Sequence, residues 1–93
     1  MIVGTLRLVL MVPGSRSLKD KRHVIRSILD TSRSRFNVSA AEIGLLNSLR
    51  SAELGFACVS NDRDIVDRLL NKILHLAQSN PLCEVTEADI EIL

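Results

Sequence analysis

Basic side chains between residues 16 and 33 are the strongest chemical signal in this sequence. At about 100° per residue, five of them fall within one helical arc of roughly 100°, and Arg16 precedes that arc. We call the six residues the basic stripe: Arg16, Lys19, Arg22, His23, Arg26 and Arg33. Asp30 is the only acid within the arc. A one-sided row of cations about three turns long can meet successive phosphates of a folded RNA. We therefore predict an RNA-binding face, the alternative being an ordinary solvated helix surface.

No other residue pattern indicates catalysis, metal binding or a cofactor. His23 and His75 have no serine, cysteine or acid arranged with them as a triad. Cys58 and Cys83 lie 25 positions apart, without a CxxC pair or a histidine at ligand spacing, so we expect reduced, structural thiols. The four glycines are isolated and form no phosphate-binding loop. We expect a non-enzymatic protein with no metal and no cofactor.

Residues 54–60, LGFACVS, partly match the third-strand signature of the RNA-recognition motif. Leu54 stands where that signature has a basic residue, and Cys58 stands where it has a second aromatic ring. Phe36 and Phe56 are the only aromatic residues, so the first strand supplies no partner ring. We therefore expect Phe56 in the core rather than on a base-stacking surface.

The charges divide the chain into two halves of opposite sign. Residues 1–50 carry nine lysines and arginines against three acids, whereas residues 51–93 carry three against eight. The net charge of +1 provides no global attraction to nucleic acid, so a polyanion must use a local patch in the first half. The longest apolar run, residues 8–13, is far shorter than the roughly 20 residues of a membrane span, and no signal peptide opens the chain. We expect a cytoplasmic protein with no membrane partner.

Hydrophobic periodicity predicts six elements. Alternation predicts strands over residues 2–12, 36–43, 54–59 and 84–93, and apolar residues three and four apart predict a helix over 18–35 and a second helix that contains residues 65–77 and is ended by Asn80 and Pro81. Ser17 with Asp20, and Asn61 with Asp64, have the spacing of capping boxes, and Ser60, Asn61 and Asp62 are the predicted cap residues of the second helix. Lys21 and Arg35 fall on the apolar side of the first helix, where we expect them to snorkel or to pair with acids of neighbouring elements.

The order βαββαβ predicts an α+β, ferredoxin-like split βαβ fold in one domain over residues 1–93. The four-stranded antiparallel sheet should have strand order 4-1-3-2, with both helices on one face. Residues of the first and third strands should line the open face: Thr5, Arg7, Val9, Ala57 and Val59. The last strand should add an acidic row to it, with Val85, Glu87, Asp89 and Glu91 on one side and Thr86, Ala88, Ile90 and Ile92 on the other. Part of this face is apolar enough to need a partner.

Four segments resemble the YlxP-like family of small bacterial proteins, which is catalogued as a domain of unknown function. They cover nearly the whole chain: MIVGTLRLVL at the start, SLKDKRHVIRS at 17–27, RFNVSAAE at 35–42 and LGFACVSND at 54–62. The resemblance implies a ferredoxin-like fold and a genomic setting beside translation initiation factor two and ribosome-binding factor A. That setting suggests ribosomal RNA or the small ribosomal subunit as a partner, but it implies no established activity and no catalytic residue. The basic run Lys19, Lys21 and Arg22 carries over from the family.

The chain departs from the family pattern at Leu45, Leu46 and Leu49, where a more polar or aromatic connection is usual. Three leucines in a surface connection can be a packing insert or an association surface. The alternative function is therefore a protein-interaction or self-association module, and a homodimer is one form of it. Such a module would use these leucines or the open sheet face.

Overall fold

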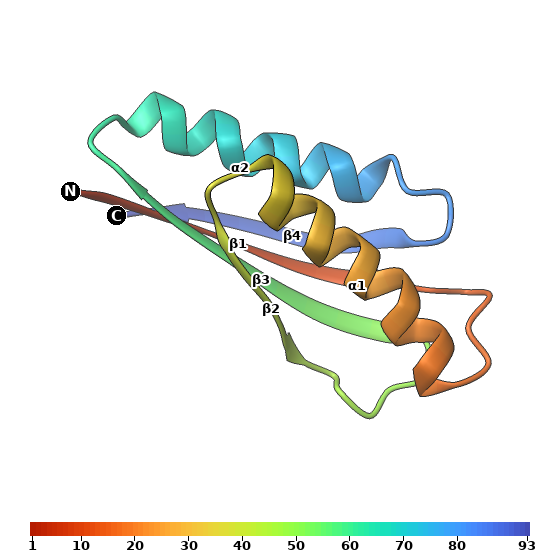
Figure 1. Ribbon diagram of the computed structural model, residues 1–93. Helices are drawn as coiled ribbons and strands as arrows, with labels where there is room; N and C mark the ends of the chain where they lie inside the picture. The colour runs from red at the N-terminus through yellow and green to blue at the C-terminus, as the bar shows by residue number, and fades with distance from the viewer.

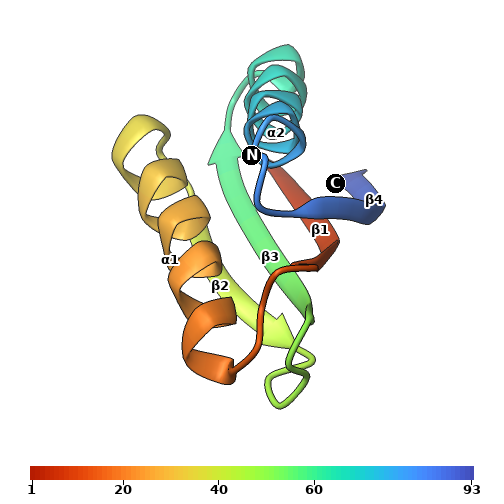
Figure 2. The same ribbon diagram turned by 90° about the vertical axis from the view of Figure 1, so that its right-hand side faces the viewer.

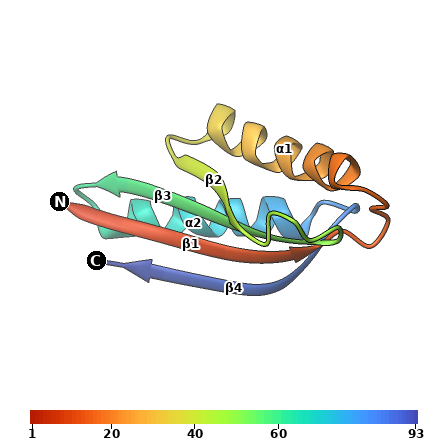
Figure 3. The same cartoon turned by 90° about the horizontal axis from the view of Figure 1, so that it is seen from below.

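The computed structural model describes residues 1–93, which form a four-stranded antiparallel sheet with two helices on one face (Figure 1). The elements are β1 (Ile2–Met11), α1 (Leu18–Arg35), β2 (Ser39–Gly44), β3 (Ser51–Ser60), α2 (Arg63–Gln78) and β4 (Glu84–Ile92). The strands lie in the order β2-β3-β1-β4, with β2 and β4 at the edges (Figure 3). The predicted ferredoxin-like fold and strand order 4-1-3-2 are therefore confirmed.

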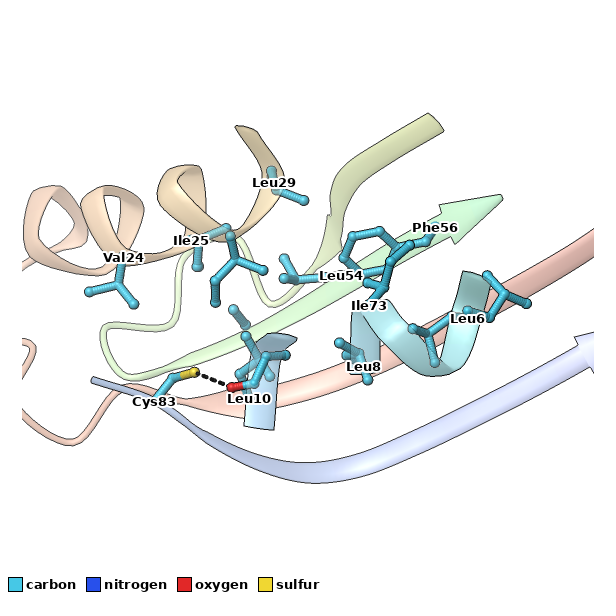
Figure 4. Close-up of a cluster of buried hydrophobic side chains, with 14 of the residues drawn as sticks. Leu6, Leu8, Leu10, Val24, Ile25, Leu29, Leu54, Phe56, Ile73 and Cys83 are labelled. Atoms are coloured by element: carbon cyan, nitrogen blue, oxygen red, sulfur yellow. Dashed lines mark hydrogen bonds between the residues drawn. The ribbon is translucent and has the colours of Figure 1, made fainter. Parts of the chain in front are cut away.

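The core lies between the sheet and the helices because alternate residues of β1 and β3 point to that side. Leu6, Leu8 and Leu10 of β1 are buried, as are Leu54 and Phe56 of β3. The helices cover them with Val24, Ile25, Ile28 and Leu29 from α1 and with Val66, Leu70, Ile73 and Ala77 from α2 (Figure 4). Helix α1 packs on β2, whereas α2 packs on β1, β3 and β4. The expectation that Phe56 belongs to the core is confirmed.

Side-chain caps define where both helices begin. The Ser17 hydroxyl accepts from the Asp20 backbone N–H at 3.1 Å, which is one half of a capping box. The Asp20 carboxylate accepts from the N–H of Arg16 at 3.0 Å, one residue before the N-cap. In α2 the N-cap is Asp62, which accepts from the Asp64 N–H at 2.9 Å. Asp62 was one of the predicted cap residues and is confirmed. The predicted capping box of Asn61 with Asp64 was wrong, because the chain turns into the helix one residue later.

Two strand irregularities escaped the sequence analysis. Val85 pairs with Leu10 while Glu87 pairs with Val9, so Thr86 is an extra residue in β4. This bulge turns Val85 to the core side, and its predicted place on the face of Glu87 was wrong. In β2, Ile43 is the extra residue between Glu42 and Gly44. Strand β3 begins at Ser51, earlier than predicted, because it pairs along the whole of β1.

Helix α2 approaches β1 closely at Gly4. A Cβ atom on Gly4 would lie 2.2 Å from Val66 Cγ1 and 3.0 Å from Leu70 Cδ1. Both of these side chains are fully buried, so they have little room to move aside.

Neither helix combines the length and the apolar character that a membrane crossing requires.

We expect Gly4→Ala to lower the free energy of unfolding by about 1–3 kcal/mol, because the added methyl overpacks the contact between β1 and α2. The matched control is Gly14→Ala, since a Cβ atom there meets no atom within 4 Å. Urea denaturation of both variants checks the prediction. Equal stability of the two variants would show that α2 adjusts to the methyl without cost.

Candidate nucleic-acid interface

All six residues of the basic stripe are exposed. Lys19, Arg22, His23 and Arg26 surround a polar hollow of about 620 Å³ on the outer side of α1, together with Asp20. Arg22, Arg26 and Arg33 also line a second hollow of about 290 Å³, which lies against Glu42 of β2. The stripe therefore faces outward along the flank of α1 that is nearer the β2 edge of the sheet.

Most cations of the stripe have no partner within the protein. The side chains of Arg16, Lys19, Arg22, His23 and Arg26 make no ion pair and no hydrogen bond. The acids near them have other partners, since Asp20 accepts from the Arg16 backbone N–H and Asp30 pairs with Arg33. Unpaired guanidinium and ammonium groups keep all their donors available for an anionic ligand.

Arg33 differs from the other members of the stripe. Its guanidinium donates to the Ala40 carbonyl of β2 and, at 3.2 Å, to the Asp30 carboxylate. These contacts tie the last turns of α1 to the edge strand and neutralise part of the charge. Arg33 therefore has a structural task, and the free part of the stripe runs from Arg16 to Arg26.

Lys21 is completely buried although its neighbours on either side belong to an exposed surface. Its ammonium donates to the carbonyls of Leu45 at 2.9 Å and Ser51 at 3.0 Å, with Leu46 at 3.5 Å. The Glu42 carboxylate lies 3.4 Å from Lys21 Nζ, so the predicted pairing with an acid of a neighbouring element is confirmed for Lys21. Leu45, whose carbonyl accepts from Lys21, has a left-handed backbone with φ of 56°. Lys21 is thus a structural member of the basic run that the family resemblance carried over.

The open sheet face has the opposite charge. Arg7 lies among three carboxylates, donating to Glu53 and, at 3.0 Å each, to Glu87 and Asp89. The hydrogen bonds that Arg7 donates to Glu87 and then to Glu53 raise the pKa of its guanidinium above the ordinary value. With Glu91 also exposed on β4, carboxylates outnumber the single cation on this face. Acids on this side and free cations on α1 leave α1 as the surface suited to an anionic partner.

The remaining candidate groups lie apart from the stripe. Cys58 and Cys83 are buried free thiols, and burial raises the pKa of each above its ordinary value, which disfavours the reactive thiolate. The Cys83 thiol donates to the Ala77 carbonyl at 3.5 Å, the dashed contact of Figure 4. No three His, Cys, Asp or Glu side chains gather as a metal site.

The three leucines of the connection between β2 and β3 are exposed, with Leu45, Leu46 and Leu49 at 47%, 52% and 51% of their full accessibility. The Lys21 ammonium holds the backbone of this connection against the first turns of α1. The leucines and the basic stripe therefore lie near the same end of α1 but on different elements.

A family model described as "Protein of unknown function (DUF503)" matches residues 3–90. The chain belongs to the DUF503 family. It is also 32% identical over 85 residues to "Uncharacterized protein YlxP" of Bacillus subtilis (strain 168), with 91% of this chain and 92% of that protein covered. The family resemblance seen in the sequence is thus confirmed.

The DUF503 fold is not restricted to natural relatives. A solved structure of the de novo designed protein Foldit4 matches all of this chain and 97% of its own, with a TM-score of 0.56 at 14% identity. At that identity the likeness concerns the fold alone. The function of this DUF503 chain must therefore be argued from its own side chains.

We expect Lys21→Met to lower the free energy of unfolding by about 3–5 kcal/mol, because it leaves buried carbonyls and the Glu42 carboxylate without their cation. Lys19→Met, two residues away on the exposed side, is the matched control and should change stability by less than about 0.5 kcal/mol. Urea denaturation measures both. Adding Glu42→Leu to Lys21→Met should recover part of the lost free energy of unfolding. Equal stability of Lys21→Met and Lys19→Met would contradict the structural role of Lys21.

Proposed function

We propose that this DUF503 chain is a non-enzymatic, cytoplasmic RNA-binding module that associates with ribosomal RNA or the small ribosomal subunit. The observation that carries the proposal is the row of exposed, unpaired cations on α1: Lys19, Arg22, His23 and Arg26, with Arg16 before them. Such groups contact phosphates irrespective of base sequence and release condensed counterions when they bind.

The distribution of charge would orient the protein so that α1 faces the RNA. Because Glu53, Glu87 and Asp89 gather around the lone Arg7 on the open sheet face, the protein has a charge dipole although its net charge is only +1. An approaching polyanion is repelled by one face and attracted by the other, which selects α1 for contact. No aromatic ring lies on the open sheet face, so this proposal requires no base stacking there.

The ribosomal target rests on different grounds from the RNA-binding surface. The resemblance to YlxP-like proteins implies a genomic setting beside translation initiation factor two and ribosome-binding factor A. The cationic surface itself suits a phosphate backbone, and the genomic setting suggests ribosomal RNA.

The exposed leucines favour self-association as a second candidate function. Leu45, Leu46 and Leu49 expose about half of their surface, and Ile43 in the adjacent bulge is 54% exposed. The backbone below them is already fixed by Lys21, so a second copy would meet an ordered apolar surface. Association then costs less conformational entropy than ordering a mobile loop would.

We expect Arg22→Glu combined with Arg26→Glu to abolish co-sedimentation with small ribosomal subunits. About four phosphate contacts give the unmodified protein a slope of roughly −3 in log affinity against log salt. Co-sedimentation across a salt series measures both quantities.

The matched control for this double variant is Arg63→Glu combined with Arg68→Glu. It makes the same change in net charge on the exposed side of α2. Binding should persist in the control, and circular dichroism should show both variants folded. If the α1 and α2 variants lose the same amount of binding, the attraction is non-specific and the α1 interface is refuted.

For the second candidate, we expect sedimentation velocity to detect a dimer that Leu46→Glu dissolves, because a buried carboxylate is costly in an apolar interface. Leu82→Glu is the matched control, since Leu82 is 60% exposed but lies in the connection between α2 and β4. A protein that remains monomeric at high concentration would rule out self-association through these leucines.

A further inference from the structure

A groove of about 790 Å³ lies between the two helices, on the flank of α1 opposite the basic stripe. Figure 2 shows the two helices side by side on one face of the sheet. Helix α1 lies over β2, and α2 packs on β1, β3 and β4. Residues of α1, of α2 and of the connection between α2 and β4 line this interhelical groove. Its size falls in the range of small-molecule binding sites.

The charged residues that line the groove are all basic. Arg35 comes from the last turn of α1, and Lys72 and His75 come from α2. No aspartate or glutamate lines it, and neither Arg35 nor Lys72 forms an ion pair. Three basic side chains from two elements therefore converge on one concave surface without an internal counterion, which suits an anionic group such as a phosphate.

The groove also has an apolar part. Phe36, one of only two aromatic residues and the only one not fully buried, lines it. Leu76 and Leu82 extend this apolar surface. A flat ring system can stack on a phenylalanine ring, and such stacking tolerates any base.

Hydrogen-bond donors complete the surface. The hydroxyls of Ser27 and Thr31 have no hydrogen-bond partner, and the Asn80 side chain accepts from the Leu82 N–H through its oxygen, which leaves its amide NH₂ free. These groups can bind the ribose hydroxyls or the edge of a base.

Both helices end near the groove, and free carbonyls at a helix C-terminus would repel an anion. Here several terminal carbonyls are occupied. The Ser32 carbonyl accepts from the Phe36 N–H at 2.9 Å, and the His75 carbonyl accepts from both the N–H and the hydroxyl of Ser79 at 2.9 and 2.7 Å. The field of the remaining terminal carbonyls must be outweighed by the charges of Arg35 and Lys72, which line the groove.

We propose that the interhelical groove binds a nucleotide, with its phosphate at Arg35 and Lys72 and its base against Phe36. This site is separate from the basic stripe and does not depend on it. The nucleotide has two sources, a free nucleoside monophosphate or the 5′-phosphorylated end of an RNA strand, which share the same chemistry.

The experiment titrates the full-length chain with each of the four ribonucleoside 5′-monophosphates and follows backbone amide shifts by NMR. We expect saturable shifts confined to residues 27–36 and 72–82, with Kd below about 1 mM. Parallel titrations use inorganic phosphate, an unphosphorylated nucleoside and a 5′-phosphorylated tetranucleotide. Saturation by the monophosphates identifies a free nucleotide, and saturation in the groove by the tetranucleotide alone identifies an RNA end.

Two variants test the contacts, and two more serve as controls. Arg35→Gln with Lys72→Gln should weaken nucleotide binding at least tenfold, whereas the matched pair Arg63→Gln with Arg68→Gln should not. Phe36→Leu should weaken the nucleotide but not inorganic phosphate, which separates base stacking from charge. Arg22→Glu with Arg26→Glu should leave the groove unaffected, so failure of RNA binding by the stripe and failure of this site are distinguishable.

Two results would overturn the proposal. One is the absence of saturable shifts in the groove with either the monophosphates or the tetranucleotide. The other is equal affinity for inorganic phosphate and nucleotide, because that outcome leaves Phe36 with no part in binding.

Discussion

The buried ammonium of Lys21 is the constraint on which the arrangement of α1 depends. A charge with no access to water must be fully compensated, and here carbonyls of the β2–β3 connection and the Glu42 carboxylate provide the compensation. These partners belong to the sheet edge, so they fix how far α1 is rotated about its own axis. Once Lys21 points inward, helical geometry turns Lys19 and Arg22 away from the sheet. The exposure of the basic stripe is therefore a consequence of the buried flank of α1, to which Lys21 belongs together with Val24, Ile25, Ile28 and Leu29.

Ion pairing also gives the two faces of the molecule opposite charges. Arg7 is the one cation on the open sheet face, and its three carboxylate partners leave that face acidic. The two acids of α1 near the stripe already have partners. The Asp20 carboxylate accepts from the Arg16 N–H, and Asp30 pairs with Arg33. A protein with a net charge of only +1 can therefore present a strongly cationic surface. The sign of the local field, rather than the net charge, decides which surface suits RNA.

Periodicity in the sequence was sufficient for the topology but not for local deviations from it. The apolar alternation of β1 and the helical spacing of α1 and α2 predicted the fold, and Ser17 predicted where α1 begins. The bulge at Thr86 could not be predicted, because period-two alternation assumes one residue per pair and a bulge breaks that count. The stripe was predicted from helical angles alone. The carbonyl partners of Lys21 and the interhelical groove depend on segments brought together only by the fold, so no local pattern contained them.

Helix α1 thus has three flanks with different tasks: one buried against the sheet, one carrying the basic stripe and one lining the interhelical groove. The free stripe ends at Arg26, and Arg35 lies nine residues further on, about 14 Å along the axis at 1.5 Å per residue. Coupling between them would require an element with two discrete arrangements. Helix α1 is continuous, held at its start by Lys21 and near its end by Arg33 and Phe36, so it offers no such alternative. Substitutions on the two flanks should therefore act additively, as distant sites without shared partners do.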